Sequence, residues 1–145
     1  MELIQQGFEV IIADDLSNSS LSVLEGMKKI SGRPVTFVEI DLKDKNRVAK
    51  LFKLHPDISG VIHFAASKAV GESILRPLEY YENNIGPLLN LLQEIEKKTV
   101  DFPFIFSSSC TVYGQADQLP MAEVTPTKKA ESPYGNTKQM GEEIL

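Results

Sequence analysis

Tyr134 and Lys138 have the residue types and the spacing for acid–base chemistry. Ser132 is a suitable N-cap and Pro133 a suitable first helical residue, so we expect a helix to begin here. Residues four apart on a helix share one face. A lysine ammonium beside a phenol favours the phenolate, and a tyrosine that exchanges its proton near neutral pH is a general base for a sugar or steroid hydroxyl. This spacing also occurs by chance on many helices, so other segments must support the interpretation.

Short apolar segments that are rich in β-branched residues predict strands at 8–13, 35–40, 60–66 and 102–108. Helical periodicity between them predicts helices that position the strands. These helices are expected at 21–30, at 44–55, at 78–97 and from Pro133 onward.

Local signals mark the ends of these helices. Gly32 is expected to close the first, and Asp44 to cap the second, with Val48, Leu51 and Phe52 on its apolar face. Pro87 predicts a kink or break in the third. The apolar face of that third helix is expected to consist of Ile85, Leu88, Leu89, Leu92 and Ile95.

Alternating strands and helices predict an α/β fold with a doubly wound parallel sheet, of the Rossmann-like NAD-binding kind. Ligands of such sheets bind at the carboxyl ends of the strands. In this fold a glycine-rich turn precedes the ribose-binding acid by about 20 residues. Only 13 residues precede Asp14, and Gly7 is the single glycine among them. We therefore interpret residues 1–145 as a partial domain that lacks its first strand, and the last predicted helix still continues at Leu145.

Asp14 and Asp41 each follow a predicted strand. A carboxylate at Asp14 would accept bonds from a ribose 2′-hydroxyl and repel a 2′-phosphate, which favours NAD over NADP. The alternative is a capping role, and for Asp41, which could meet the adenine edge, that alternative is nearly as good. The polar loop suited to lining an adenosine pocket consists of Asp15, Leu16, Ser17, Asn18 and Ser19.

Hydroxyl groups follow the fourth predicted strand, at residues 107–114, where they could bond a substrate oxygen. Cys110 has no histidine near it in sequence, so we interpret it as a small residue lining the site. His63 is expected to be a satisfied core histidine. Lys68 follows a predicted strand and could pair with a cofactor phosphate or ribose, although a lone lysine is usually a solvated charge. Two histidines and one cysteine offer no metal-ligand spacing.

The composition narrows the classes of partner. The chain has 145 residues and a net charge of −5, which argues against nucleic acid or an anionic membrane as a partner. Its apolar runs are too short to cross a bilayer, and no secretory leader opens the sequence. One cysteine allows no internal disulfide. We therefore expect a cytoplasmic protein.

Four segments resemble the UDP-glucose 4-epimerases, within the extended short-chain dehydrogenase/reductase family: residues 61–73, 76–84, 107–114 and 132–138. The segment 68–73 is the most specific, whereas Tyr-x-x-x-Lys marks only the superfamily. The resemblance implies an NAD-dependent isomerase that interconverts UDP-glucose and UDP-galactose through a 4-keto sugar. Tyr134 would be the base, Lys138 its electrostatic partner, and Ser109 the hydroxyl that bonds the sugar O4. For the full-length protein the resemblance implies a homodimer and a C-terminal substrate region that residues 1–145 lack.

The resemblance also implies a set of binding residues. Substrate contacts fall on Ser109, Cys110, Thr111 and Tyr134. NAD contacts fall on Asp14, Asp15, Ser17, Asn18, Ser19, Asp41, Leu42, Phe64, Ala65, Ala66, Lys68, Asn83 and Lys138. Three positions depart from the family pattern: Cys110 replaces the commoner alanine, Asp15 asparagine and Ala66 glycine.

Two alternatives stay open. The first is another nucleotide-sugar 4-epimerase, or a 4,6-dehydratase of the same family. A dehydratase needs an Asp-Glu acid/base pair where this chain has Cys110 and Thr111. The second is that the chain by itself is an inactive fragment that binds NAD weakly or not at all.

Overall fold

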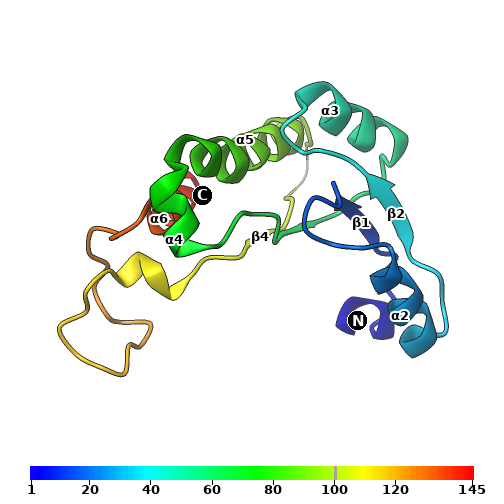
Figure 1. Cartoon of the computed structure of the whole chain (residues 1–145). Helices are drawn as coiled ribbons and strands as arrows, with labels where there is room; N and C mark the ends of the chain where they lie inside the picture. Colours follow the sequence, from blue (N-terminus) through cyan, green and yellow to red (C-terminus); the bar gives the residue numbers. More distant parts are fainter. Residues whose placement is uncertain (100) are drawn as a thin grey trace. The chain divides into compact units, whose positions relative to one another are not determined.

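The structure is a computed structural model that describes residues 1–99 and 101–145. The chain forms two compact units, residues 1–42 and residues 43–145. Helices and strands alternate along the chain, and both strand pairs are parallel (Figure 1). The α/β class and the parallel strands are therefore confirmed.

Unit 1 contains α1 (Glu2–Gln5), β1 (Ile11–Asp14), α2 (Ser22–Ser31) and β2 (Thr36–Glu39). Gly32 ends α2 with a φ of 71°, the left-handed conformation that glycine adopts without a steric penalty, as predicted. β1 and β2 pair from Ile11↔Thr36 to Asp14↔Glu39. Beyond the pair, the Ile40 amide donates to the Asp14 carbonyl at 2.9 Å. Asp14 and the residues after β2 therefore lie at one edge of this sheet.

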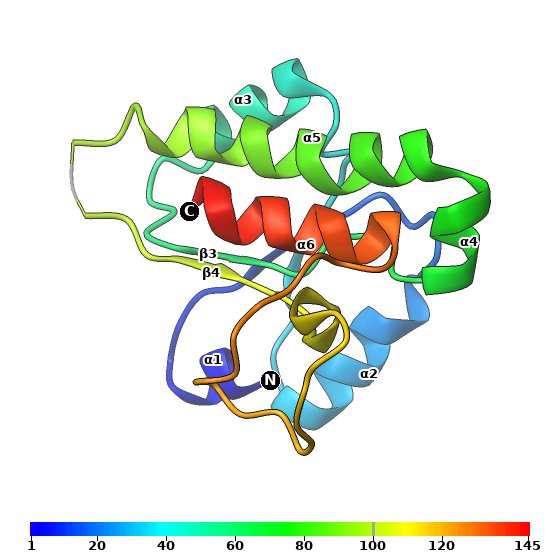
Figure 2. The same cartoon turned by 90° about the vertical axis from the view of Figure 1, so that its left-hand side faces the viewer.

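Unit 2 contains α3 (Lys45–Leu54), β3 (Val61–His63), α4 (Val70–Leu75), α5 (Pro77–Ile95), β4 (Phe104–Phe106), the 3₁₀ helix η1 (Cys110–Tyr113) and α6 (Pro133–Ile144). β3 and β4 pair from Val61↔Phe104 to His63↔Phe106. α5 packs beside α6, and Figure 2 shows the two helices side by side. α4 and η1 are elements that the sequence pattern did not predict.

The predicted caps are confirmed at two helices. The Asp44 carboxylate accepts bonds from the backbone amides of Asn46 and Arg47 at the start of α3. The Ser132 hydroxyl accepts a bond from the Gly135 amide at 3.1 Å, and Pro133 is the first residue of α6. Both caps satisfy backbone donors that a helix leaves open at its N-terminus.

α5 differs from expectation in two ways. It is one helix from Pro77 to Ile95 with Pro87 inside it, so of the predicted kink or break the break is wrong, and the kink stays a prediction. Gly86 precedes Pro87 and has no Cβ to clash with the proline ring, which removes part of the restriction on that residue. Leu88 is fully buried, but Leu89 is 41% exposed and does not belong to the core face. No described helix, α5 included, is long and apolar enough to cross a membrane.

α6 lies very close to β4 and η1 because two glycines face them. A Cβ at Gly141 would come within 2.7 Å of Cε1 in the Phe106 ring. A Cβ at Gly135 would lie 3.2 Å from the Thr111 Cβ and 3.3 Å from the Thr111 carbonyl oxygen. A Cβ at Gly141 would come closer to the Phe106 ring than side chains tolerate, and one at Gly135 would make a tighter contact than usual, so glycine at both positions allows α6 to lie against β4 and η1.

The long segment between η1 and α6 is tied to α6 by one side chain. The Gln139 amide nitrogen donates to the carbonyls of Val112 and Lys128, and its oxygen accepts from the Ala130 amide. Gln139 therefore joins both ends of the segment 113–128 to α6.

Candidate functional site

Tyr134 and Lys138 lie in the first two turns of α6 and are both buried, with exposed fractions of 9% and 4%. The Lys138 Nζ lies 6.0 Å from the centroid of the Tyr134 ring. The predicted common face is therefore confirmed, and it brings a phenol and an ammonium together away from bulk water.

The Lys138 ammonium is held by the end of β4. It donates to the Ser107 carbonyl oxygen at 2.7 Å and lies 4.8 Å from the centroid of the Phe106 ring. Burial lowers the pKa of Lys138, because a charge is less well solvated inside the protein than in water. The carbonyl and the ring face offset part of that cost.

His63 at the end of β3 is buried between aromatic rings. Its ring centroid lies 6.1 Å from that of Phe104 and 6.2 Å from that of Phe106. Burial, together with the positive charge of Lys138, lowers the pKa of His63 to about 4. The core location is as predicted. Nε2 has no hydrogen-bond partner among the described residues, so the prediction that the ring nitrogens of His63 are satisfied is wrong. The phenylalanine rings beside it supply no acceptor or donor.

The hydroxyls after β4 form a compact group. The Ser109 Oγ caps η1 by accepting from the Thr111 amide at 3.3 Å, and the Thr111 hydroxyl donates to it at 3.0 Å. Ser109 and Thr111 are half-buried, and Cys110 between them is exposed. Because Gly135 lies against Thr111, this group stands beside the first turn of α6. The structure thus brings the two predicted catalytic motifs together.

The loop after β3 reaches the same sheet edge as the segment after β4, since the Ser107 amide donates to the His63 carbonyl at 3.2 Å. Phe64, Ala65 and Lys68 of this loop are exposed, and Ala66 is half-buried. Asn83, a predicted NAD contact, donates from Nδ2 to the Ser67 hydroxyl at 3.0 Å. Its amide therefore supports the loop.

The predicted adenosine-binding residues lie in unit 1. The Asp14 Oδ1 accepts from the Leu16 amide and from the Ser19 hydroxyl, each at 2.7 Å. These bonds hold Leu16 in a left-handed conformation, with a φ of 58°, that is uncommon outside glycine. The Asp15 carboxylate similarly accepts from the amide and hydroxyl of Ser17. Asn18 is exposed, Asp41 is half-buried and Leu42 is buried.

The chemistry at the end of β1 fits the ribose of a dinucleotide. Both bonds to Asp14 use Oδ1, so Oδ2 remains an acceptor for ribose hydroxyls at the carboxyl end of a parallel strand. In unit 2 the exposed Lys68 offers a positive charge at the equivalent end of β3. The described residues contain no group of three or more histidine, cysteine, aspartate or glutamate side chains arranged to hold a metal ion.

Within unit 2, three polar residues that the sequence did not single out connect the loop after β3 with α5 and α6: Tyr80, Asn84 and Thr137. All three are buried, and Asn84 donates to the Thr137 hydroxyl at 3.0 Å. The Thr137 hydroxyl in turn donates to the Tyr134 carbonyl at 2.7 Å. The adjacent asparagines of α5 could have indicated this connection. Asparagine is a poor helix former, so two of them inside a helix suggest that their side chains make contacts elsewhere.

Comparison with known proteins gives a consistent result. The model of the NAD dependent epimerase/dehydratase family matches residues 1–145. The chain is 46% identical to the UDP-glucose 4-epimerase of Erwinia amylovora and 45% identical to that of Bacillus subtilis, over 145 residues in each case. Each match covers the whole of this chain but only 42% of the length of the relative.

Solved structures agree. The UDP-glucose 4-epimerase of Bifidobacterium longum, determined with NAD+ and UDP, matches with a TM-score of 0.92 at 43% identity, over 99% of this chain and 42% of that one. The UDP-Glc/GlcNAc 4-epimerase of Campylobacter jejuni matches with a TM-score of 0.88 at 34% identity, over 99% and 42%. With a family model that matches every residue, the chain belongs to the NAD-dependent epimerase/dehydratase family.

Proposed function

We propose that this chain is the NAD-binding part of a UDP-glucose 4-epimerase, an isomerase that interconverts UDP-glucose and UDP-galactose. The observation that carries the proposal is the face of α6 that presents Tyr134 and Lys138 beside the Ser109–Thr111 hydroxyls. Curated UDP-glucose 4-epimerases that are 40–46% identical to this chain support this substrate.

In this proposal Tyr134 removes the proton from the sugar 4-hydroxyl and later returns it, as a general base and then a general acid. Lys138, one helical turn away, stabilises the tyrosinate through its positive charge. The Ser109 hydroxyl orients the sugar O4, and Cys110 and Thr111 line the same pocket. Bound NAD would supply the acceptor for the C4 hydride and the source from which that hydride returns to the opposite face of the sugar.

We propose that NAD is held by two sets of residues. The adenosine set is Asp14, Asp15, Ser17, Asn18, Ser19, Asp41 and Leu42. The second set is Phe64, Ala65, Ala66, Lys68, Asn83 and Lys138. The fit of Asp14 Oδ2 to a ribose hydroxyl supports the first set, and the positive charges of Lys68 and Lys138 support the second.

We also propose that residues 1–145 form part of one doubly wound sheet in a longer cytoplasmic protein that acts as a homodimer. The pairing supports this, since both described strand pairs are parallel, as are the strands of a doubly wound sheet, whose first strand this proposal leaves outside residues 1–145. The matched relatives, of which this chain spans 42%, have room for that strand and for a substrate region.

The test is the variant Tyr134→Phe in the full-length protein, assayed with UDP-galactose and, for specificity, with UDP-N-acetylgalactosamine. Loss of the general base is expected to reduce turnover at least about 100-fold without unfolding the protein. Tyr81→Phe is the matched control, because its hydroxyl bonds Asn136 at 2.8 Å and is assigned no part in the reaction. Turnover near the wild-type rate in Tyr134→Phe would rule out the role given to this tyrosine.

A further inference from the structure

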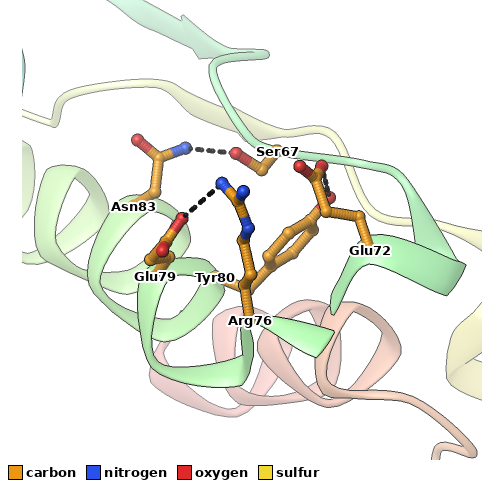
Figure 3. A network of polar contacts seen from close by, with 6 residues as sticks. All are labelled: Ser67, Glu72, Arg76, Glu79, Tyr80 and Asn83. Carbon is orange, nitrogen blue, oxygen red and sulfur yellow. Dashed lines mark hydrogen bonds and ion pairs between the residues drawn. The ribbon is translucent and has the colours of Figure 1, made fainter. Parts of the chain in front are cut away.

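Side chains of α5 hold the backbone on both sides of Lys68 through hydrogen bonds. Preceding it, the Ser67 amide donates to the Asn84 Oδ1 at 2.8 Å, and the Ser67 carbonyl accepts from the Asn84 Nδ2 at 3.0 Å. Following it, the Ala69 amide donates to the Tyr80 hydroxyl at 3.1 Å. Asn83 adds a bond to the Ser67 hydroxyl at 3.0 Å. Figure 3 shows the side chains of Tyr80 and Asn83 beside this segment.

We call Tyr80, Asn83 and Asn84 the α5 clamp. Tyr80 and Asn84 are 3% and 4% exposed, so water does not compete freely for their bonds. Lys68 itself is exposed. A loop whose residues on both sides of a lysine are fixed, while the lysine side chain is left to the solvent, presents that side chain at a defined position.

Glu72 in α4 orients the Tyr80 hydroxyl. Its Oε2 accepts from the Tyr80 hydroxyl at 2.9 Å, which leaves the oxygen lone pair of Tyr80 directed at the Ala69 amide. Burial and the bond to Glu72 raise the pKa of Tyr80, so the tyrosine remains a neutral donor at physiological pH. The ion pair that Arg76 and Glu79 form nearby is exposed at both ends and contributes little (Figure 3).

We propose that Tyr80 and Asn84 are positioning residues, which fix Lys68 so that its ammonium binds a phosphate of the dinucleotide. The inference rests on the proposed function, because it requires NAD as the ligand. A fixed ammonium loses less conformational freedom on binding than one on a mobile loop, and this difference appears as affinity. Asn84 also bonds Thr137, so the same side chain supports the turn of α6 that carries Tyr134.

The experiment compares Tyr80→Phe, Lys68→Met and the double variant in the full-length protein, with NAD⁺ affinity measured by calorimetry on cofactor-stripped protein. Tyr80→Phe keeps the ring and removes the bond to Ala69, and it is expected to weaken NAD⁺ binding roughly fivefold. On the Lys68→Met background the same change is expected to have no further effect, because Tyr80 acts through Lys68.

Amide hydrogen exchange supplies a readout that does not involve the cofactor. In Tyr80→Phe the Ala69 amide is expected to exchange faster, whereas the Ser67 amide, bonded to Asn84, is expected to keep its protection. Glu79→Gln is the matched control on the adjacent residue and is expected to change neither exchange nor affinity. Glu72→Gln retains an acceptor for Tyr80 and is expected to keep NAD⁺ affinity within about twofold.

The outcomes separate the two proposals. If Tyr80→Phe weakens NAD⁺ binding by the same factor with and without Lys68, Tyr80 acts through general stability, and the positioning role is overturned while the proposed function stands. If the wild-type protein does not bind NAD⁺ at all, both proposals are overturned. A loss of affinity in Tyr80→Phe that disappears on the Lys68→Met background supports the positioning role.

Discussion

The ammonium of Lys138 affects the ionisation of the residues around it. It is buried, bonded to the Ser107 carbonyl and placed over the Phe106 ring. Its charge adds to burial in holding the pKa of His63 at about 4. One positive charge therefore does two things in this region: it keeps His63 neutral and, in the proposed reaction, it stabilises the tyrosinate of Tyr134.

The lowered pKa of His63 predicts an acid-sensitive contribution to stability. The unfolded chain takes up a proton at pH 6.5, whereas the folded chain takes it up near pH 4. Stability is therefore complete above pH 6.5 and is lost as the pH falls toward 4, by up to about 3 kcal/mol. Denaturant unfolding at pH 7.5 and pH 4.5 measures this loss.

His63→Leu is the comparison variant, because it keeps an apolar side chain between Phe104 and Phe106 and cannot titrate. Carboxylates titrate in both proteins, so the contribution of His63 is the difference between their pH dependences. An equal fall in unfolding free energy for wild type and His63→Leu over this range would contradict the prediction.

α6 is the helix that assembles the candidate site. It carries Tyr134 and Lys138, and its two glycines at positions 135 and 141 allow contact with η1 and β4. A side chain at Gly141 would force α6 or the Phe106 ring to shift, and one at Gly135 would press on Thr111. The position of the phenol relative to Ser109 and Thr111 therefore depends on residues with no chemistry of their own.

Gly141→Ala tests this dependence. Its Cβ would lie 2.7 Å from Cε1 of Phe106, so ring and helix must separate, and we expect a loss of about 2 kcal/mol in unfolding free energy. Gly71→Ala in α4 is the control, since nothing lies within 4 Å of its added Cβ. That variant is expected to gain up to about 1 kcal/mol through the lower entropy of its unfolded chain. Equal stability of the two variants in urea unfolding would refute the close packing of α6.

The parts of the fold that could be predicted are those set by local interactions. The caps at Asp44 and Ser132 and the end at Gly32 each depend on a few neighbouring residues, and all three are as expected. Pro87 could not be predicted in the same way, because the packing of α5 overrides the local tendency to break. Leu89 was assigned to the core by periodicity, but the burial of Leu91 turns Leu89 toward the solvent.

In the candidate site, too, the local contacts could be predicted from the sequence and the long-range contacts could not. Tyr134 and Lys138 could be paired from sequence because four residues separate them on one helix. The bonds of Asn84 to Ser67 and Thr137 span 17 and 53 residues, and no local pattern specifies such contacts. The missing partner of His63 Nε2 likewise depends on which side chains the fold places around that ring.

The two units of the chain have unequal cores. The buried apolar side chains in the described part of unit 1 are Ile4, Ile40 and Leu42. Those of unit 2 include Phe52, Leu88, Leu91 and Val112. A unit of about 40 residues with so little buried apolar surface is at the lower limit of independent stability.

Hydrogen exchange of the 145-residue chain is therefore expected to show two levels of protection. Amides of β1 and β2 are expected to exchange at least about tenfold faster than those of α5, because unit 1 opens at a lower free energy. Mass spectrometry of peptides from residues 8–40 and 77–95 makes the comparison. Equal protection of the two sets would mean that the chain unfolds as one cooperative body.

The geometry of the site does not depend on the length of the segment 113–128, because Gln139 holds both ends of that segment on α6. The bonds of Gln139 to Val112, Lys128 and Ala130 fix both ends of that segment on α6, whatever lies between them. Loop closure becomes only slowly more costly as residues are added. Insertions and deletions within 115–127 should thus accumulate during evolution without displacing Tyr134 from its place in α6.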